Sequence, residues 1–225
     1  MKKQERYRFI LEYFEKTSPR TETELKYNNP YELLVAVMLS AQCTDKRINQ
    51  VTPALFAAYP TVHDMAKATP DDLLEYIGSV SYPNSKARHL GEMARVVSEK
   101  FNGTIPDNFD SLVSLPGVGR KTANVMLAVA FGQAALAVDT HVFRVSHRLG
   151  LVPDSCNTPE KTEKELVKNI PQDIISDSHH WLLLHGRYIC KARRPECEKC
   201  VFTSICKYFA AEKKPIDSKQ SGKTS

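Results

Sequence analysis

The sequence lacks a long hydrophobic run: no apolar stretch among its 225 residues approaches the roughly 20 residues that a membrane-spanning helix needs. Its N-terminus lacks the apolar segment of a signal peptide, and Glu5 and Glu12 argue against a transit peptide. Hydrophobic residues make up 42% and charged residues 25%, which excludes collagen-like, low-complexity and mostly disordered chains. We therefore expect a cytoplasmic protein that is not bound to a membrane and that has a buried core.

The chain also has few alternating β-branched runs of the kind that indicate strands. Apolar residues instead recur at spacings of three and four, which is typical of helices. Short loops join these segments, so we expect an all-α bundle. Periodicity, capping residues, prolines and glycines predict helices over 30–39, 45–59 (with Asp45 as cap), 70–78, 86–101, 107–114, 121–131, 140–149, 158–170 and 177–190.

Positive charge is concentrated at one end of the chain. The net charge is +5, yet the residues before Gly186 are nearly balanced, with 21 basic and 22 acidic side chains. From Gly186 onward there are ten basic and four acidic side chains. A basic end favours an anionic partner such as nucleic acid, and a solvated tail is the alternative. Residues 211–225 lack apolar periodicity, which predicts a disordered basic tail.

Four of the six cysteines lie in this basic end, with the spacing Cys190-x6-Cys197-x2-Cys200-x5-Cys206. In a chain that we expect inside the cell, this spacing favours a metal site over disulfides. Four thiolates suit either one zinc ion or a [4Fe–4S] cluster. Zinc knuckles usually contain two CxxC pairs and this segment has one, which favours iron–sulfur without deciding the question.

Three cations lie between the first two of these cysteines: Lys191, Arg193 and Arg194. A short loop pinned by a metal presents charges to phosphates without having to order them on binding. The alternative interpretation is that these three cations are solvated surface charges with no binding role. We prefer phosphate contact because these cations lie inside the metal loop.

A glycine-rich hairpin, Leu115-Pro116-Gly117-Val118-Gly119-Arg120-Lys121-Thr122-Ala123, lies between two predicted helices. Gly117 and Gly119 allow positive φ and leave their N–H groups unshielded, and the helix that follows favours anions at its start. With Arg120 and Lys121 beside these amides, the hairpin is a candidate phosphate-binding nest. A plain connector is the alternative. The hairpin lacks the spacing and preceding strand of a Walker A loop.

Lys121 has two candidate roles. It is a phosphate contact or, if the apolar helix partly desolvates it, a nucleophile with a lowered pKa. Asp139 follows 18 residues later, in Val138-Asp139-Thr140-His141-Val142. An acid at this place is often an N-cap. Paired with Lys121 at a phosphate-binding site, it is a candidate for covalent catalysis on a nucleotide sugar.

These segments together resemble the endonuclease III group of DNA repair glycosylases. The resemblance covers about residues 5–210, in order and at the family's spacing. It extends to the early-helix motif Leu39-Ser40-Ala41-Gln42-Cys43-Thr44-Asp45, the catalytic-aspartate segment 138–145, the segments 179–181 and 185–187, and the four-cysteine ending.

The resemblance implies an all-α protein in two lobes, with DNA lying across the cleft between them. One lobe is a six-helix barrel domain, residues 23–133, with the helix-hairpin-helix at about 107–131. The other joins residues 1–22 to 134–210 and carries a [4Fe–4S] cluster on Cys190, Cys197, Cys200 and Cys206. The implied substrate is double-stranded DNA containing oxidised pyrimidines or abasic sites, and we expect a monomeric bacterial enzyme associated with the nucleoid.

The resemblance also implies a mechanism. The damaged nucleotide is flipped out of the duplex, and Lys121 displaces the base at C1′. Asp139 assists, and β-elimination from the Schiff base cuts the strand. Gln42 fills the gap in the duplex. Tyr82 stands where relatives often insert an apolar wedge, but here the loop reads Ser81-Tyr82-Pro83, where many relatives have Gly-x-Tyr.

Three other functions compete with this hypothesis. Adenine or mismatch glycosylases of the family lack lysine at the position of Lys121, and the adenine-specific members carry a further C-terminal domain, for which this chain ends too soon. A non-catalytic DNA-binding module with a zinc site predicts no covalent intermediate. An iron–sulfur electron carrier needs no Gly-x-Gly-Arg-Lys hairpin.

Overall fold

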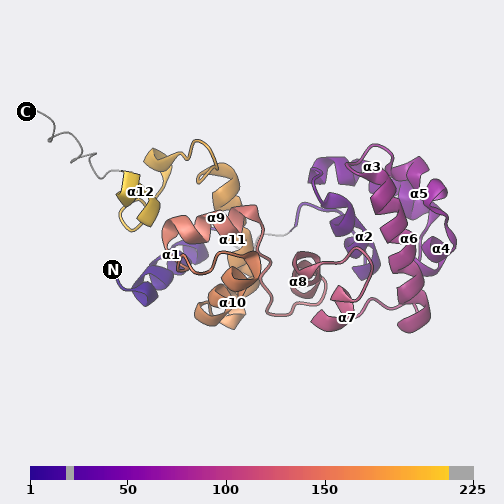
Figure 1. The fold of residues 1–225 in the computed structure, drawn as a ribbon, viewed down its shortest axis with the longest axis horizontal. Helices are drawn as coiled ribbons and strands as arrows, with labels where there is room; N and C mark the ends of the chain where they lie inside the picture. Colours follow the sequence, from indigo (N-terminus) through magenta and orange to yellow (C-terminus); the bar gives the residue numbers. More distant parts are fainter. Residues whose placement is uncertain (19–22, 213–225) are drawn as a thin grey trace, which may run out of the picture. The chain divides into compact units, whose positions relative to one another are not determined.

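The computed structural model describes residues 1–18 and 23–212, and every regular element in these two ranges is a helix (Figure 1). The all-α prediction is confirmed. The chain divides into two compact units: unit 1 is Met1–Thr21 with Val138–Ser225, and unit 2 is Glu22–Ala137. The predicted boundaries at 22–23 and 133–134 lie near these bounds, and the assignment of domain roles stays a prediction. No helix in the described ranges is long and apolar enough to cross a membrane.

Unit 2 is built around one buried helix. Its elements are α2 (Pro30–Ser40), α3 (Asp45–Ala58), α4 (Val62–Lys67), α5 (Pro70–Ile77), α6 (Pro83–Lys100), α7 (Phe109–Val113) and α8 (Arg120–Val129). Four consecutive residues of α2, from Leu33 to Ala36, are fully buried. A helix that is apolar on all sides belongs in the core, and α2 contacts α3, α6 and α8.

Local capping chemistry determines where these helices begin. Asn29 caps α2, and Thr69 forms a capping box with Asp72 at the start of α5. The cap of α3 is Thr44, whose hydroxyl accepts the Arg47 N–H, so the prediction of Asp45 as the cap was wrong by one residue.

Two helix predictions for unit 2 need correction. Helix α6 begins at Pro83, three residues before the predicted start, because proline suits the first turn and Tyr82 turns the chain in a left-handed conformation. Helix α4 was missed because its six residues are too few to show a periodic pattern.

Unit 1 brings the N-terminal helix together with the C-terminal third of the chain. Its elements are α1 (Lys3–Thr17), α9 (Thr140–Leu149), α10 (Pro159–Asn169), η1 (Gln172–Ile174), α11 (Ile175–Tyr188), η2 (Cys197–Lys199) and α12 (Lys207–Glu212). The Phe14 ring lies 5.9 Å from Trp181 and 5.2 Å from Phe202. The indole N–H of Trp181 donates to the Ser18 carbonyl at 2.8 Å. These contacts join α1 to α11 and to the cysteine-rich segment.

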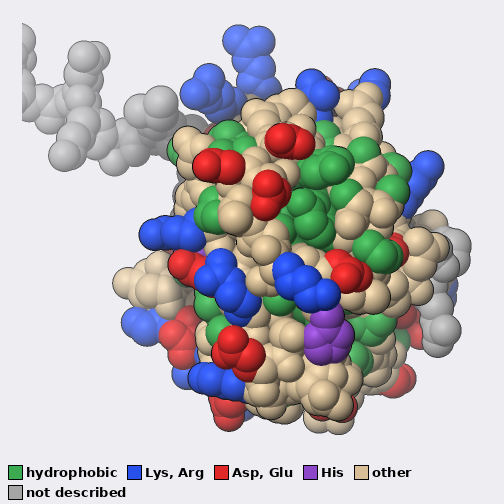
Figure 2. All heavy atoms as spheres, turned by 90° about the vertical axis from the view of Figure 1, so that its right-hand side faces the viewer, with side chains coloured by type: hydrophobic (Ala, Val, Ile, Leu, Met, Phe, Trp, Pro, Cys, Tyr) green, Lys and Arg blue, Asp and Glu red, His purple; other side chains and the backbone are tan. Residues whose placement is uncertain are grey.

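The predicted tail disorder is wrong for residues 211 and 212, which end α12, and residues 213–225 lie outside the described ranges. In Figure 2, which looks onto the α4 and α5 side of unit 2, basic and acidic side chains alternate around exposed hydrophobic atoms. The face in this view therefore does not gather positive charge for phosphate binding.

Candidate active site

The hairpin between α7 and α8 approaches its neighbours closely at one glycine. Gly117 has φ +77°, and a Cβ there would lie 2.8 Å from His89 Cβ and 2.9 Å from Met38 Cε. Gly119 has φ −95°, and nothing lies within 4 Å of the place of its Cβ. The positive φ that both glycines allow is therefore present at Gly117 and not at Gly119. What Gly119 provides is an exposed backbone without a side chain.

The start of α8 is open to solvent. Gly119 is its N-cap and has no side chain that could cap the helix. The Arg120 guanidinium lies over the Phe109 ring, with its carbon 4.6 Å from the ring centre. Lys121 is exposed, so the partial desolvation that we considered for it is absent. Backbone amides and the Lys121 amine thus meet solvent at one helix start, where an anion is stabilised.

Three residues that we predicted to contact DNA line one pocket of unit 2. Gln42, Tyr82 and Gly117 come from three separate turns and border a pocket of about 190 Å³. The side chains of Gln42 and Tyr82 are exposed, with Tyr82 at 65%. The remaining lining residues are Met38, Ala41, Ser85, Lys86 and His89.

Gln42 and Tyr82 also share an uncommon backbone conformation. Their φ angles are +56° and +55°, and Asn102 is the only other non-glycine residue with positive φ in the described ranges. Such left-handed residues are rare outside glycine and are enriched where a site requires a fixed geometry. Local sequence patterns gave no signal for this strain.

Asp139 is the N-cap of α9, as one of our two interpretations stated. Its Oδ1 accepts the N–H groups of His141 and Val142, both at 2.8 Å. The carboxylate is half-buried, and Oδ2 takes part in neither bond. Capping therefore fixes the carboxylate through one oxygen and leaves the other for further chemistry. Asp139 belongs to unit 1 and Lys121 to unit 2.

The four clustered cysteines all belong to unit 1. Cys190 and Cys206 are buried, and Cys197 and Cys200 are half-buried. Burial raises the pKa of the Cys197 and Cys200 thiols, and the charges of neighbouring cysteines raise it further. The sulfurs therefore lie within electrostatic range of one another. Within residues 1–18 and 23–212, no three His, Cys, Asp or Glu side chains form a group that could hold a single metal ion.

The chemistry of this donor set fits an iron–sulfur cluster. Such a cluster is held by four cysteine thiolates. The Cys206 thiol donates to the Arg148 carbonyl at 3.2 Å, and Cys200 Sγ lies 3.7 Å from His185 Nε2. Protein groups already surround these sulfurs, as they commonly do around metal ligands.

The three predicted phosphate contacts of the cysteine loop, Lys191, Arg193 and Arg194, are exposed. Glu196, which sequence reasoning missed, forms ion pairs with both Lys191 and Lys199. These hydrogen bonds from Lys191 and Lys199 lower the pKa of Glu196 to about 2, so it stays ionised. The charge of Lys191 is therefore partly compensated inside the loop.

Two arginines of α9, also missed, hold the backbone of this loop. Arg144 donates to the carbonyls of Gly186 at 2.8 Å and Cys190 at 3.0 Å. Arg148 donates to the carbonyls of Lys191 at 2.7 Å and Ala192 at 2.9 Å. Their spacing of four residues places both on one face of α9, and that spacing was the available signal. The helix that begins at Asp139 thus supports the cysteine loop.

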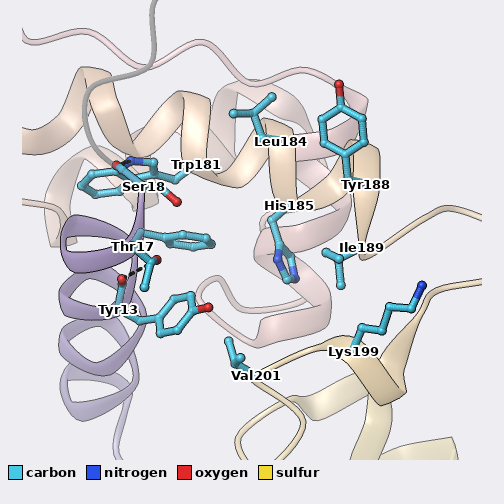
Figure 3. A pocket seen from close by; sticks show the side chains of 11 residues that line it. Tyr13, Thr17, Ser18, Trp181, Leu184, His185, Tyr188, Ile189, Lys199 and Val201 are labelled. Carbon is cyan, nitrogen blue, oxygen red and sulfur yellow. Dashed lines mark hydrogen bonds between the residues drawn. The ribbon is translucent and has the colours of Figure 1, made fainter.

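A second pocket, of about 310 Å³, lies in unit 1 (Figure 3). Aromatic side chains from α1 and α11 surround it, including Tyr13, Trp181 and Tyr188, and Lys199 lies at its edge. His185 also points into it, and burial lowers the pKa of this imidazole to about 4. The ring is therefore neutral at physiological pH where it approaches Cys200.

Known proteins resemble this chain over nearly its whole length. Endonuclease III from Rickettsia felis is 46% identical over 210 residues, which cover 93% of this chain and 96% of the relative. Endonuclease III from Escherichia coli K12 is 42% identical, covering 88% of this chain and 93% of the relative. The HhH-GPD superfamily of base excision DNA repair proteins matches residues 35–172.

Solved structures agree with the sequence relatives. A trapped covalent intermediate of endonuclease III with DNA, an estranged-adenine complex, has a TM-score of 0.88 at 42% identity. It covers 94% of this chain, which in turn covers 99% of it. A thermostable thymine-DNA glycosylase has a TM-score of 0.81 at 25% identity, with 93% and 97% coverage. This chain belongs to the endonuclease III family, within the HhH-GPD superfamily of base excision DNA repair proteins.

Proposed function

We propose that this protein removes oxidised pyrimidines from double-stranded DNA and cleaves the strand at the abasic site through a Schiff base on Lys121. As a member of its family it is a DNA glycosylase and AP lyase of base excision repair. The observation that carries the proposal is the exposed Lys121 amine on the first turn of α8, directly after the hairpin. In this position an amine can reach a sugar whose phosphate is bound by the hairpin amides.

The hairpin provides the DNA backbone contact. Gly117 is kept as glycine by its positive φ and its close neighbours, and the uncapped start of α8 presents N–H groups to a phosphate. Such contacts read no sequence, which suits an enzyme that must recognise damage at any position. Gln42 and Tyr82 border the same pocket as Gly117. In the proposal, their side chains enter the DNA duplex and fill the space that the flipped nucleotide leaves.

The chemistry needs a nucleophile and a group that handles protons and charge. The neutral Lys121 amine attacks C1′, the glycosidic bond breaks, and the base leaves with its bonding electrons. Asp139 accepts a proton from the amine or stabilises positive charge on the sugar through Oδ2. The C1′–O4′ bond then breaks, O4′ takes up a proton, and the opened sugar is joined to Lys121 as a Schiff base at C1′. Loss of the 2′ proton from this Schiff base forms the C2′–C3′ double bond and expels the 3′ phosphate. A trapped covalent DNA intermediate in a relative supports this covalent route.

Cys190, Cys197, Cys200 and Cys206 hold a [4Fe–4S] cluster in this proposal. When bound, the cluster ties the cysteine loop into a fixed shape, and its role is structural. Arg193, Arg194 and the partly compensated Lys191 then present positive charge to DNA phosphates from that loop.

Borohydride trapping tests the nucleophile. Incubating the protein with a duplex that contains one oxidised pyrimidine should give a covalent protein–DNA adduct, because borohydride reduces the Schiff base. Lys121→Gln should lose the adduct completely, since an amide forms no Schiff base. Lys46→Gln, which changes another exposed lysine of unit 2, serves as the matched control and should keep it. An adduct that persists in Lys121→Gln would show that another amine is the nucleophile.

Metal analysis tests the cluster independently of activity. The purified protein should be brown and contain about four irons per chain, the content of one [4Fe–4S] cluster. Removal of the iron should lower the melting temperature, because the loop would lose its four thiolate ligands. A colourless protein with one zinc per chain would contradict the assignment, even if the trapping result stands.

A further inference from the structure

The turn that carries Gln42 and the turn that carries Tyr82 are joined by side-chain hydrogen bonds. Ser81 Oγ donates to the Gln42 carbonyl at 2.7 Å. Lys86 Nζ donates to the carbonyls of Leu39 and Ala41, both at 2.7 Å. Three carbonyls at the end of α2 therefore accept bonds from one short segment, 81–86, at the start of α6.

Lys86 is unusual because its amine is largely buried and donates to backbone carbonyls of the protein. The residue is 9% exposed, and burial lowers the pKa of its amine. Two carbonyls directed at Nζ favour the ammonium form against that effect. Carbonyls at the end of a helix also bind cations well, because the last four have no partner within the helix. Lys86 thus satisfies carbonyls where α2 ends and Gln42 turns the chain.

One of these bonds falls on a strained residue, Gln42, and its donor Ser81 directly precedes the other strained residue, Tyr82. Gln42 and Tyr82 both have left-handed backbones, and both side chains are exposed beside the same pocket. Residues held in this conformation need support from the surrounding structure. The support here connects one strained turn to the other, so a change in either turn is transmitted to its partner.

We propose that Ser81 and Lys86 are positioning residues that hold the Gln42 and Tyr82 turns together, so that both exposed side chains enter damaged DNA as one preformed unit. This inference rests on the proposed function, because it takes DNA as the ligand of both turns. The advantage is preorganisation: side chains fixed before binding lose less conformational entropy when DNA arrives. Neither Ser81 nor Lys86 touches DNA in this proposal.

A double-mutant cycle between Ser81 and Tyr82 tests the inference. The measurement is the Kd for a duplex that contains a reduced abasic site, which the enzyme cannot cleave. Tyr82→Ala and Ser81→Ala should each weaken binding, by about tenfold and about threefold. In the double variant the two factors should not multiply, because Ser81 acts only through the turns that it joins. Effects that multiply fully would overturn the proposal.

Two further variants separate positioning from general stability. Lys86→Met keeps a side chain of similar length but loses both Nζ hydrogen bonds, so Kd should rise at least as much as in Ser81→Ala. The melting temperature of each variant is measured alongside Kd. Thr61→Ala removes an exposed hydroxyl hydrogen bond elsewhere in unit 2 and should leave Kd unchanged. Equal Kd changes in Thr61→Ala and Ser81→Ala would mean a general loss of stability and would reject positioning.

The trapping assay distinguishes failure of this inference from failure of the proposed function. Ser81→Ala should still form the full amount of borohydride-trapped adduct at saturating DNA, because Lys121 is untouched. Absence of the adduct in the unmodified protein would refute the proposed function itself. Normal trapping combined with multiplicative Kd effects would refute only the role of Ser81.

Discussion

The N-termini of α8 and α9 differ in how their backbone N–H groups are satisfied. Each leaves backbone N–H groups without partners inside the helix. At α9 the chain fills the position itself, because Asp139 Oδ1 accepts two of these N–H groups. At α8 the N-cap is Gly119, which has no side chain that could accept these N–H groups. The first start is complete within the protein, and the second is open to an external anion.

Because of this difference, the two helix N-termini are suited to different functions. An uncapped start costs stability unless water or a ligand satisfies it, so α8 is suited to binding a phosphate. A capped start holds a carboxylate in a fixed orientation, so α9 is suited to presenting the second oxygen of Asp139 to a reaction. Under the proposed function, the start of α8 in unit 2 binds the phosphate through backbone N–H groups beside the nucleophile Lys121, and Asp139 of unit 1 assists the chemistry.

Substituting Asp139 should give the largest effect. Asp139→Asn keeps an amide oxygen that caps α9 as well as the carboxylate does, so folding should be unchanged. It removes the negative charge, so the rate of base removal should fall by roughly 10²- to 10⁴-fold with little change in Kd for DNA. Single-turnover kinetics and a binding titration measure the two quantities.

Asp139→Ala separates capping from chemistry. It should lose the same catalytic rate and, in addition, about 1 kcal/mol of unfolding free energy, because the cap is removed. A normal rate in Asp139→Asn would leave the N-cap as the whole role of this residue.

Converting the α8 start into an α9-type start should have an intermediate effect. Gly119→Asp has room, since nothing lies within 4 Å of the new Cβ. It should raise the unfolding free energy by a few tenths of a kcal/mol by capping α8. It should also weaken DNA binding by about tenfold or more, because the carboxylate takes the N–H groups and repels the phosphate.

The neutral substitution Gly119→Asn is the matched control. It caps equally well without the charge, so its loss of affinity isolates competition for the N–H groups from repulsion. If Gly119→Asp binds DNA as tightly as the unmodified protein, the start of α8 is a connector and the comparison between the two helices fails.

Sequence patterns predicted features that depend on neighbouring residues. The periodicity and the caps predicted most helices, and Thr140–Leu149 was predicted to the residue. The N-cap interpretation of Asp139 followed from its place before that helix. The positive φ that the two hairpin glycines allow is present at Gly117.

Features that depend on contacts between distant segments were not predictable in this way. The bonds from Lys86 to the end of α2 span more than 40 residues, and the support of the cysteine loop by Arg148 spans a similar separation. No local pattern marks such partners. Two roles were open for Lys121, and the sequence could not decide whether its side chain is exposed, because packing and not composition determines which face of an apolar helix is buried.

The smallest predicted effect concerns the loop cations, which in the proposed function bind phosphate by charge, whereas α8 binds it through backbone amides. Arg193→Ala should reduce the slope of log Kobs against log salt by about 0.9, the value for one lost phosphate contact. Lys191→Ala should change the slope less, because Glu196 already compensates that ammonium. Glu196→Gln should strengthen binding at low salt by releasing Lys191, provided that the iron content is unchanged. Equal slopes for the Arg193 and Lys191 variants would mean that DNA displaces the internal ion pair.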